Sequence, residues 1–122
     1  MLLDDFFHIQ KIENEGSALK AFININKTHK IFQGHFPAVP IVPGVCMMQM
    51  MREIMELQCK RKLIIRSGDN MKFLSVINPT VNSEIEAAIQ YEEGQDGSVK
   101  INATLHAGTT IFFKLKATLA SA

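Results

Sequence analysis

Apolar and polar positions alternate along most of the chain with the two-residue period of half-buried β-strands. The runs that alternate most clearly cover residues 17–25, 84–92, 99–106 and 111–119, and residues 6–12 form a further strand candidate that is rich in β-forming residues. Two shorter apolar segments, residues 62–66 and 71–77, predict further strands that are separated by a turn at Ser67-Gly68. Asp96-Gly97 and Ala107-Gly108 are hairpin turn pairs, so the last three strands are expected to form an antiparallel meander.

The segment Gly44 to Gln58 has a helical pattern and is apolar around nearly its whole circumference. A helix of this kind is buried nearly all round, and its methionines can pack against the irregular concave face of a curved sheet. Only one stripe is polar, at helical spacing: Gln49, Arg52, Glu53 and Glu56. The preceding residues, 29–43, contain three prolines and predict an ordered, extended loop that is neither helix nor central strand: Pro37, Pro40 and Pro43.

The order of elements predicts an α+β domain in which one antiparallel sheet wraps around one central helix. A length of 122 residues fits a single domain, residues 1–122. Such a sheet leaves a long edge strand exposed, and pairing two sheets edge to edge in a dimer would cover it.

Composition narrows the function classes. The net charge of +1 predicts no general attraction to nucleic acid or to membranes. No apolar run approaches the roughly 20 residues of a membrane span, and residues 1–10 do not resemble a secretory signal, so we expect a cytoplasmic protein. Cys46 and Cys59 fall in one helix about 20 Å apart, too far for a disulfide, and are interpreted as small buried side chains.

The segment Gly34 to Val45 combines a histidine with a helix start that has no capping side chain. His35 lies in a proline-restrained loop, and Pro43-Gly44 begins the helix without Ser, Thr, Asp or Asn before it. Free N–H groups at a helix start attract a partly negative oxygen, and Gly44 lets a ligand approach the backbone. This arrangement suits proton abstraction beside a carbonyl, although a solvated histidine and hydrated amides are the alternative.

The run from Phe32 to Val45 resembles the signature of bacterial 3-hydroxyacyl-acyl carrier protein dehydratases of the FabZ/FabA type, approximately F-x-G-H-F-P-x-x-P-x-x-P-G-V. Nine positions agree at fixed spacing: Phe32, Gly34, His35, Phe36, Pro37, Pro40, Pro43, Gly44 and Val45. The resemblance extends along nearly the whole chain and implies the hotdog fold. It also implies dehydration of a 3-hydroxyacyl chain carried on acyl carrier protein, without metal or organic cofactor.

By this resemblance, His35 acts as the base or proton shuttle at C2, and the Gly44 N–H polarises the thioester carbonyl. A carboxylate from the neighbouring subunit's helix then assists departure of the hydroxyl. Counting from Pro43 places Gln49 at that carboxylate position, and an amide cannot deliver a proton. Glu53, one turn later, is a candidate auxiliary acid; the alternative is that it belongs to the polar stripe and only pairs with charge there.

Two surfaces are candidates for binding. Phe36, Met48 and Phe73 are expected to line an acyl tunnel, together with the substrate-contacting Pro43 and Val45 at the helix start. A basic cluster after the helix could dock an acidic carrier protein, or could simply complement the helix dipole: Lys60, Arg61, Lys62 and Arg66.

Three functions remain open. The first is an active dehydratase of fatty acid or polyene/polyketide-type synthesis. The second is an impaired pseudo-dehydratase that binds acyl carrier protein or pairs with an active hotdog subunit, as a homodimer, a larger oligomer or a hetero-oligomer. The third is a hotdog acyl thioesterase, which the signature disfavours.

Overall fold

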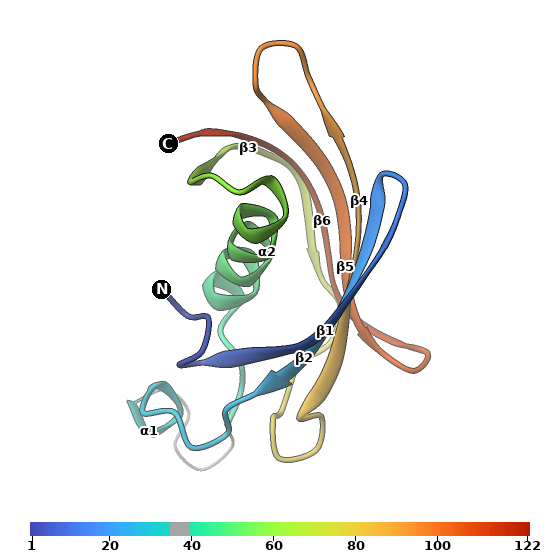
Figure 1. Ribbon diagram of the computed structural model, residues 1–122. Helices are drawn as coiled ribbons and strands as arrows, with labels where there is room; N and C mark the ends of the chain where they lie inside the picture. Colours follow the sequence, from blue (N-terminus) through green and yellow to red (C-terminus); the bar gives the residue numbers. More distant parts are fainter. Residues whose placement is uncertain (35–39) are drawn as a thin grey trace.

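The computed structural model describes residues 1–34 and 40–122. A six-stranded antiparallel sheet curls around one long helix, α2, which lies in its concave face (Figure 1). The predicted α+β class and the single central helix are therefore confirmed. The strands are β1 (Phe7–Glu15), β2 (Ala18–Ile25), β3 (Leu63–Phe73), β4 (Glu84–Glu93), β5 (Val99–Ala107) and β6 (Thr110–Ser121).

The strand order in the sheet is β1-β2-β4-β5-β6-β3, so β1 and β3 are the two edges. The strands β4, β5 and β6 form the predicted antiparallel meander, with Ile89 opposite Ala103 and Ala103 opposite Leu115. Period-two alternation turns one side chain in two toward the helix, which explains why these three residues are buried.

Helix α2 spans Gly44–Cys59, one residue longer than the sequence pattern predicts. Four of its side chains, Met50, Met51, Ile54 and Met55, have no exposed surface. The helix ends at Lys60, whose left-handed backbone (φ 58°) lets its N–H bond to the Glu56 carbonyl. Neither helix in the described part of the chain is long and apolar enough to cross a membrane.

Strand β3 differs from the prediction. The two short strands expected over 62–66 and 71–77 are one strand, Leu63–Phe73, and no turn separates them. The pairing register with β6 shifts twice, between Ile65 and Ser67 and between Gly68 and Asn70, so β-bulges absorb the residues that suggested a turn. The chain leaves the regular strand after Phe73.

The predicted loop over residues 29–43 also differs, because it contains a one-turn helix, α1 (Ile31–Gly34), before its first proline. His29 bonds to the start of this helix: its Nδ1 accepts the Ile31 N–H at 3.1 Å, and its Nε2 lies 3.0 Å from the Asp5 carboxylate. The imidazole packs edge-on against Phe6.

Candidate active site

The start of α2 carries no side-chain cap, as the sequence predicts. Pro43 occupies the N-cap with an extended backbone (φ −63°, ψ 146°), and no side chain of the described residues caps the helix. Its carbonyl accepts the N–H groups of Cys46 and Met47. Without a capping side chain, the first turn of the helix keeps N–H groups for another acceptor.

An apolar groove of about 420 Å³ opens at this helix start. The segment before the helix forms one wall and the segment that follows β3 forms the other. The Phe73 ring stacks on Phe113 with 4.9 Å between ring centroids, and 54% of Phe73 is exposed. The lining residues are Ile41, Val42, Pro43, Gly44, Met47, Phe73, Leu74, Ser75 and Val76.

Gly44 is in close contact with the Phe73 ring. A Cβ placed on Gly44 would lie 2.8 Å from Cε1 and 2.9 Å from Cζ of that ring. Since carbon atoms normally pack at about 3.5–4.0 Å, only glycine fits at this position without moving the ring. The glycine therefore keeps both the groove and the helix backbone accessible.

The groove brings together Pro43, Gly44 and Phe73 of the predicted site. Val45 and Met48 are not among its lining residues; Val45 is on the surface with 73% of its area exposed. His35 and Phe36 lie outside the described residues.

Residues 74–76 also line this groove, a contribution that the prediction of a strand over residues 71–77 does not include. In the structure, residues 74–76 lie outside the strand and beside the helix start. The sequence signal for this wall is the apolar character of Leu74 and Val76, which the structure shows to be exposed.

Glu53 is buried, with only 1% of its surface exposed. Its Oε1 accepts the N–H of Leu3 at 2.8 Å, and both of its oxygens accept the N–H of Leu2. Its Oε2 also accepts a 2.8 Å hydrogen bond from the side-chain amide of Gln49. Glu53 thus leaves the expected polar surface stripe and bonds to neutral donors from the N-terminal segment and from its own helix.

Glu56 is the second buried carboxylate of α2, at 8% exposure. Its Oε2 accepts the Leu63 N–H at 2.9 Å and a 3.0 Å hydrogen bond from Arg52, which also reaches the Leu63 carbonyl. These contacts tie the end of α2 to the start of β3.

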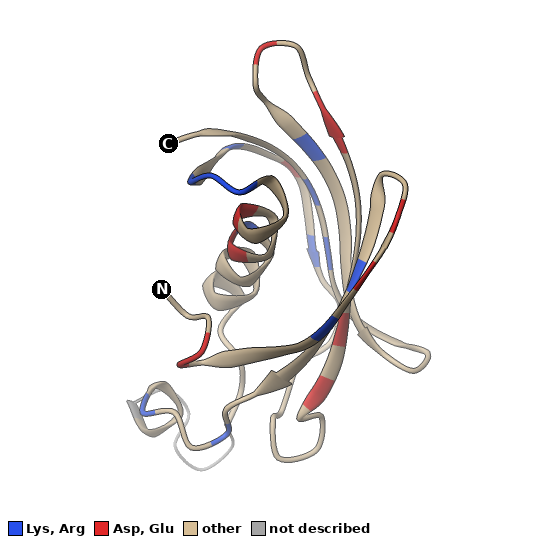
Figure 2. Cartoon of the chain, viewed as in Figure 1, with Lys and Arg blue, Asp and Glu red and all other residues tan. Residues whose placement is uncertain are grey.

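Basic residues gather where α2 leads into β3 (Figure 2). Arg61 is engaged in the fold: it donates to the Gly97 carbonyl at 2.9 Å and to the Ser121 hydroxyl at 3.1 Å. Arg66 lies 3.9 Å from Asp96. Lys60, Lys62 and Arg66 are exposed, so these three residues are the accessible part of the predicted docking cluster.

Both cysteines are free thiols. Burial raises the pKa of the Cys46 thiol, so a reactive thiolate at the helix start is disfavoured. Burial, followed by the nearby Glu93 carboxylate, also raises the pKa of Cys59. Both residues behave as small apolar side chains, as the sequence predicts.

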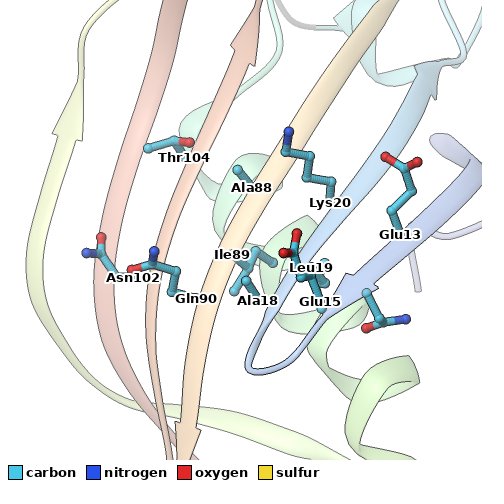
Figure 3. Close-up of a pocket in the computed structure, with 11 residues that line it drawn as sticks. Glu13, Glu15, Ala18, Leu19, Lys20, Ala88, Ile89, Gln90, Asn102 and Thr104 are labelled. Atoms are coloured by element: carbon cyan, nitrogen blue, oxygen red, sulfur yellow. The ribbon is translucent and has the colours of Figure 1, made fainter.

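A second hollow, of about 650 Å³, lies on the outer face of the sheet, away from α2 (Figure 3). Polar side chains from β1, β2 and β5, among them Glu13, Lys20, Asn102 and Thr104, line it. It includes none of the predicted site residues.

Known proteins resemble this chain in sequence. Residues 10–111 match the family described as ApeI-like, ApeI dehydratase. The chain belongs to the ApeI-like dehydratase family. A 3-hydroxyacyl-[acyl-carrier-protein] dehydratase FabZ from Lactococcus lactis subsp. cremoris is 31% identical over 100 residues, which cover 76% of this chain and 67% of that protein. The resemblance to FabZ-type dehydratases is therefore confirmed.

Solved structures confirm the hotdog fold of this ApeI-like chain. The dehydratase heterocomplex ApeI:P from Xenorhabdus doucetiae superposes with a TM-score of 0.74 at 18% identity, covering 93% of this chain and 96% of that chain. A mutant thioesterase from Pseudomonas aeruginosa superposes with a TM-score of 0.64 at 11% identity, covering 90% of this chain and 78% of that chain. At such identities the likeness concerns the fold alone.

Proposed function

We propose that this chain is a 3-hydroxyacyl thioester dehydratase that acts on acyl chains carried by acyl carrier protein. The observation that carries the proposal is the uncapped start of α2 at Gly44, which opens into an apolar groove. An acyl chain fits against the apolar walls of this groove, and a thioester oxygen at the helix start would accept a backbone N–H. Family membership and the FabZ relative support the same reaction class.

The reaction is an elimination. His35 removes a proton from C2, while the Gly44 N–H stabilises the enolate oxygen that develops on the thioester. The electron pair forms the C2–C3 double bond as the C3–O bond breaks. Since Gln49 cannot supply a proton, His35 returns the same proton to the departing hydroxyl, and one water leaves.

The test is turnover of a short 3-hydroxyacyl thioester by the purified protein, followed as enoyl absorbance and, in parallel, as free thiol. We expect enoyl product and no thiol, and we expect loss of turnover in His35→Ala. Release of thiol without enoyl product would instead make the chain a thioesterase.

A second candidate is a subunit whose active site is completed by another hotdog chain. Two observations favour it: Gln49 stands at the carboxylate position, and β3 is an exposed edge strand. Apolar side chains on and near this edge are at least half exposed, which is typical of a surface that pairs: Val45, Ile64, Phe73, Leu74 and Val76.

Complementation within this chain distinguishes the two candidates. The double variant His35→Ala/Gln49→Glu has a carboxylate but no histidine, whereas the wild type has the reverse. If the site combines residues from two subunits, a refolded mixture of the two proteins should turn over faster than either protein alone. Equal turnover rates per wild-type chain, with and without the double variant, would leave the independent dehydratase as the function.

A further inference from the structure

Three lysines gather on the outer face of the sheet, away from α2 (Figure 2). On β6, Lys114 is directly opposite Lys72 of β3 and Thr104 of β5. Lys116, two positions further along β6, is the middle of a second row, between an asparagine of β3 and one of β5. Side chains two apart on a strand point to the same side, so both rows share one face: Asn70, Lys72, Asn102, Thr104, Lys114 and Lys116.

These six side chains line a hollow of about 370 Å³. Among the described residues, the only other one that lines it is the buried Leu115, so no carboxylate faces the hollow. Ammonium, amide and hydroxyl groups all donate hydrogen bonds. The hollow adjoins the one in Figure 3, with which it shares Asn102 and Thr104, and it has no lining residue in common with the groove at Gly44.

The three lysines have no acidic partner. In the part of the chain that the structure describes, none of them forms an ion pair. Asp69, the neighbouring acid on β3, accepts from the hydroxyls of Ser67 at 3.0 Å and Thr118 at 3.5 Å. Residues directly opposite each other have Cβ atoms about 4.5–5.5 Å apart, and like charges there are destabilising. Lys72 and Lys114 therefore repel each other in the free protein, and an anion between them would remove that repulsion.

We propose that this hollow binds a phosphate group that carries at least two negative charges, as a phosphomonoester or a diphosphate does. Three ammonium groups on flexible stems can converge on the oxygens of one compact polyanion, and the amides and the hydroxyl beside them supply further donors. The volume lies in the range of small-molecule sites, about 300–1,000 Å³, whereas a protein partner would need a broad surface. The site is separate from the groove at Gly44 and does not depend on the proposed function.

The first test is an NMR titration with inorganic pyrophosphate, with sodium chloride at equal ionic strength as the reference. We expect saturable shifts of the backbone amides of residues 70–72, 102–104 and 114–116, which chloride does not produce. Shifts that follow ionic strength alone would overturn the proposal. The lysines would then be charges that protect the β3 edge from unwanted strand pairing.

A pair of variants with equal net charge tests the location. Lys72→Gln/Lys114→Gln should weaken pyrophosphate binding by about tenfold or more, because it removes two charge-assisted contacts. Lys60→Gln/Lys62→Gln removes the same charge from exposed lysines outside the hollow and should bind as the wild type does. Equal affinity of the two variants for pyrophosphate overturns the proposal.

The stability of the free protein gives an independent readout. Without pyrophosphate, Lys72→Gln/Lys114→Gln should melt about 1–5 °C above the wild type, because the repulsion between the opposite lysines is gone. Lys72→Arg/Lys114→Arg keeps both charges and should retain both the wild-type Tm and pyrophosphate binding. Loss of binding in this charge-conserving variant, with the fold intact, would contradict a site based on charge.

A vesicle assay distinguishes a soluble ligand from a lipid headgroup. Cosedimentation with vesicles of phosphatidylcholine and phosphatidic acid, lost in Lys72→Gln/Lys114→Gln, would assign the site to a headgroup phosphate. Pyrophosphate binding without cosedimentation would assign it to a soluble phosphorylated molecule. Binding to neither probe overturns the proposal and leaves the dehydratase function untouched.

Discussion

Replacing Gly44 with alanine should block the groove while leaving the fold nearly as stable as before. The new Cβ would lie 2.8 Å from Phe73 Cε1, so the ring must move by about 0.7 Å or more to reach an ordinary contact distance. Because 54% of Phe73 is exposed, the ring can swing toward solvent. It then occupies the space that we assign to the acyl chain.

The energy terms nearly cancel. Weakening the stack of Phe73 on Phe113 costs about 0.5–1.5 kcal/mol, while alanine gains up to about 1 kcal/mol over glycine in a helix. We therefore expect the free energy of unfolding to change by less than about 1 kcal/mol, a Tm shift of a few degrees. Turnover should fall by roughly 100-fold, since a displacement near 1 Å can cost that much.

The assay combines thermal unfolding with enoyl formation. Gly68→Ala is the matched control: its Cβ would meet only the flexible end of Met71, at 3.1 Å, far along the chain from the helix start. This variant should keep its turnover. Wild-type turnover in Gly44→Ala with an unchanged Tm would refute the assignment of the groove. A loss of more than 3 kcal/mol in stability would refute the energy reasoning.

Three further predictions concern other parts of the molecule. Glu53→Ala leaves buried N–H donors unpaired and should lower the free energy of unfolding by about 2–4 kcal/mol in urea denaturation; a change below 0.5 kcal/mol would contradict the burial argument. Burial raises the pKa of both thiols, so iodoacetamide should label Cys59 slowly and the more buried Cys46 more slowly still; equal labelling rates in native and urea-unfolded protein would contradict this. For the same reason, the stability that the neutral thiols provide should be lost as pH rises above about 9. Charge reversal at the exposed lysines, Lys60→Glu/Lys62→Glu, should weaken binding to acyl carrier protein at low salt more than at high salt, and salt-independent binding would exclude a steering role.

Much of the fold follows from the sequence, because its elements are half-buried or fully buried. Strand β5 alternates apolar and polar residues throughout, and strands β2, β4 and β6 do so over most of their length. Helix α2 is apolar almost all round, so local pattern alone predicts these elements. The strand β3 was predicted less well. Its bulges at 65–67 and 68–70 depend on pairing with β6, and no local pattern distinguishes a bulge from a turn there.

The candidate site likewise has features that the sequence predicts and features that depend on the tertiary structure. The motif from Phe32 to Val45 and the missing cap at Pro43 can be read directly from the sequence, because both are local properties.

Only the tertiary structure decided which distant residues meet. It brought Phe73 against Gly44 to form the groove, and it brought Leu2 and Leu3 to the Glu53 carboxylate, about 50 positions along the chain. A charged residue in a polar stripe normally faces water. Glu53 instead became a buried acceptor because the N-terminal segment folds over α2, a contact that depends on the closure of the whole sheet around the helix.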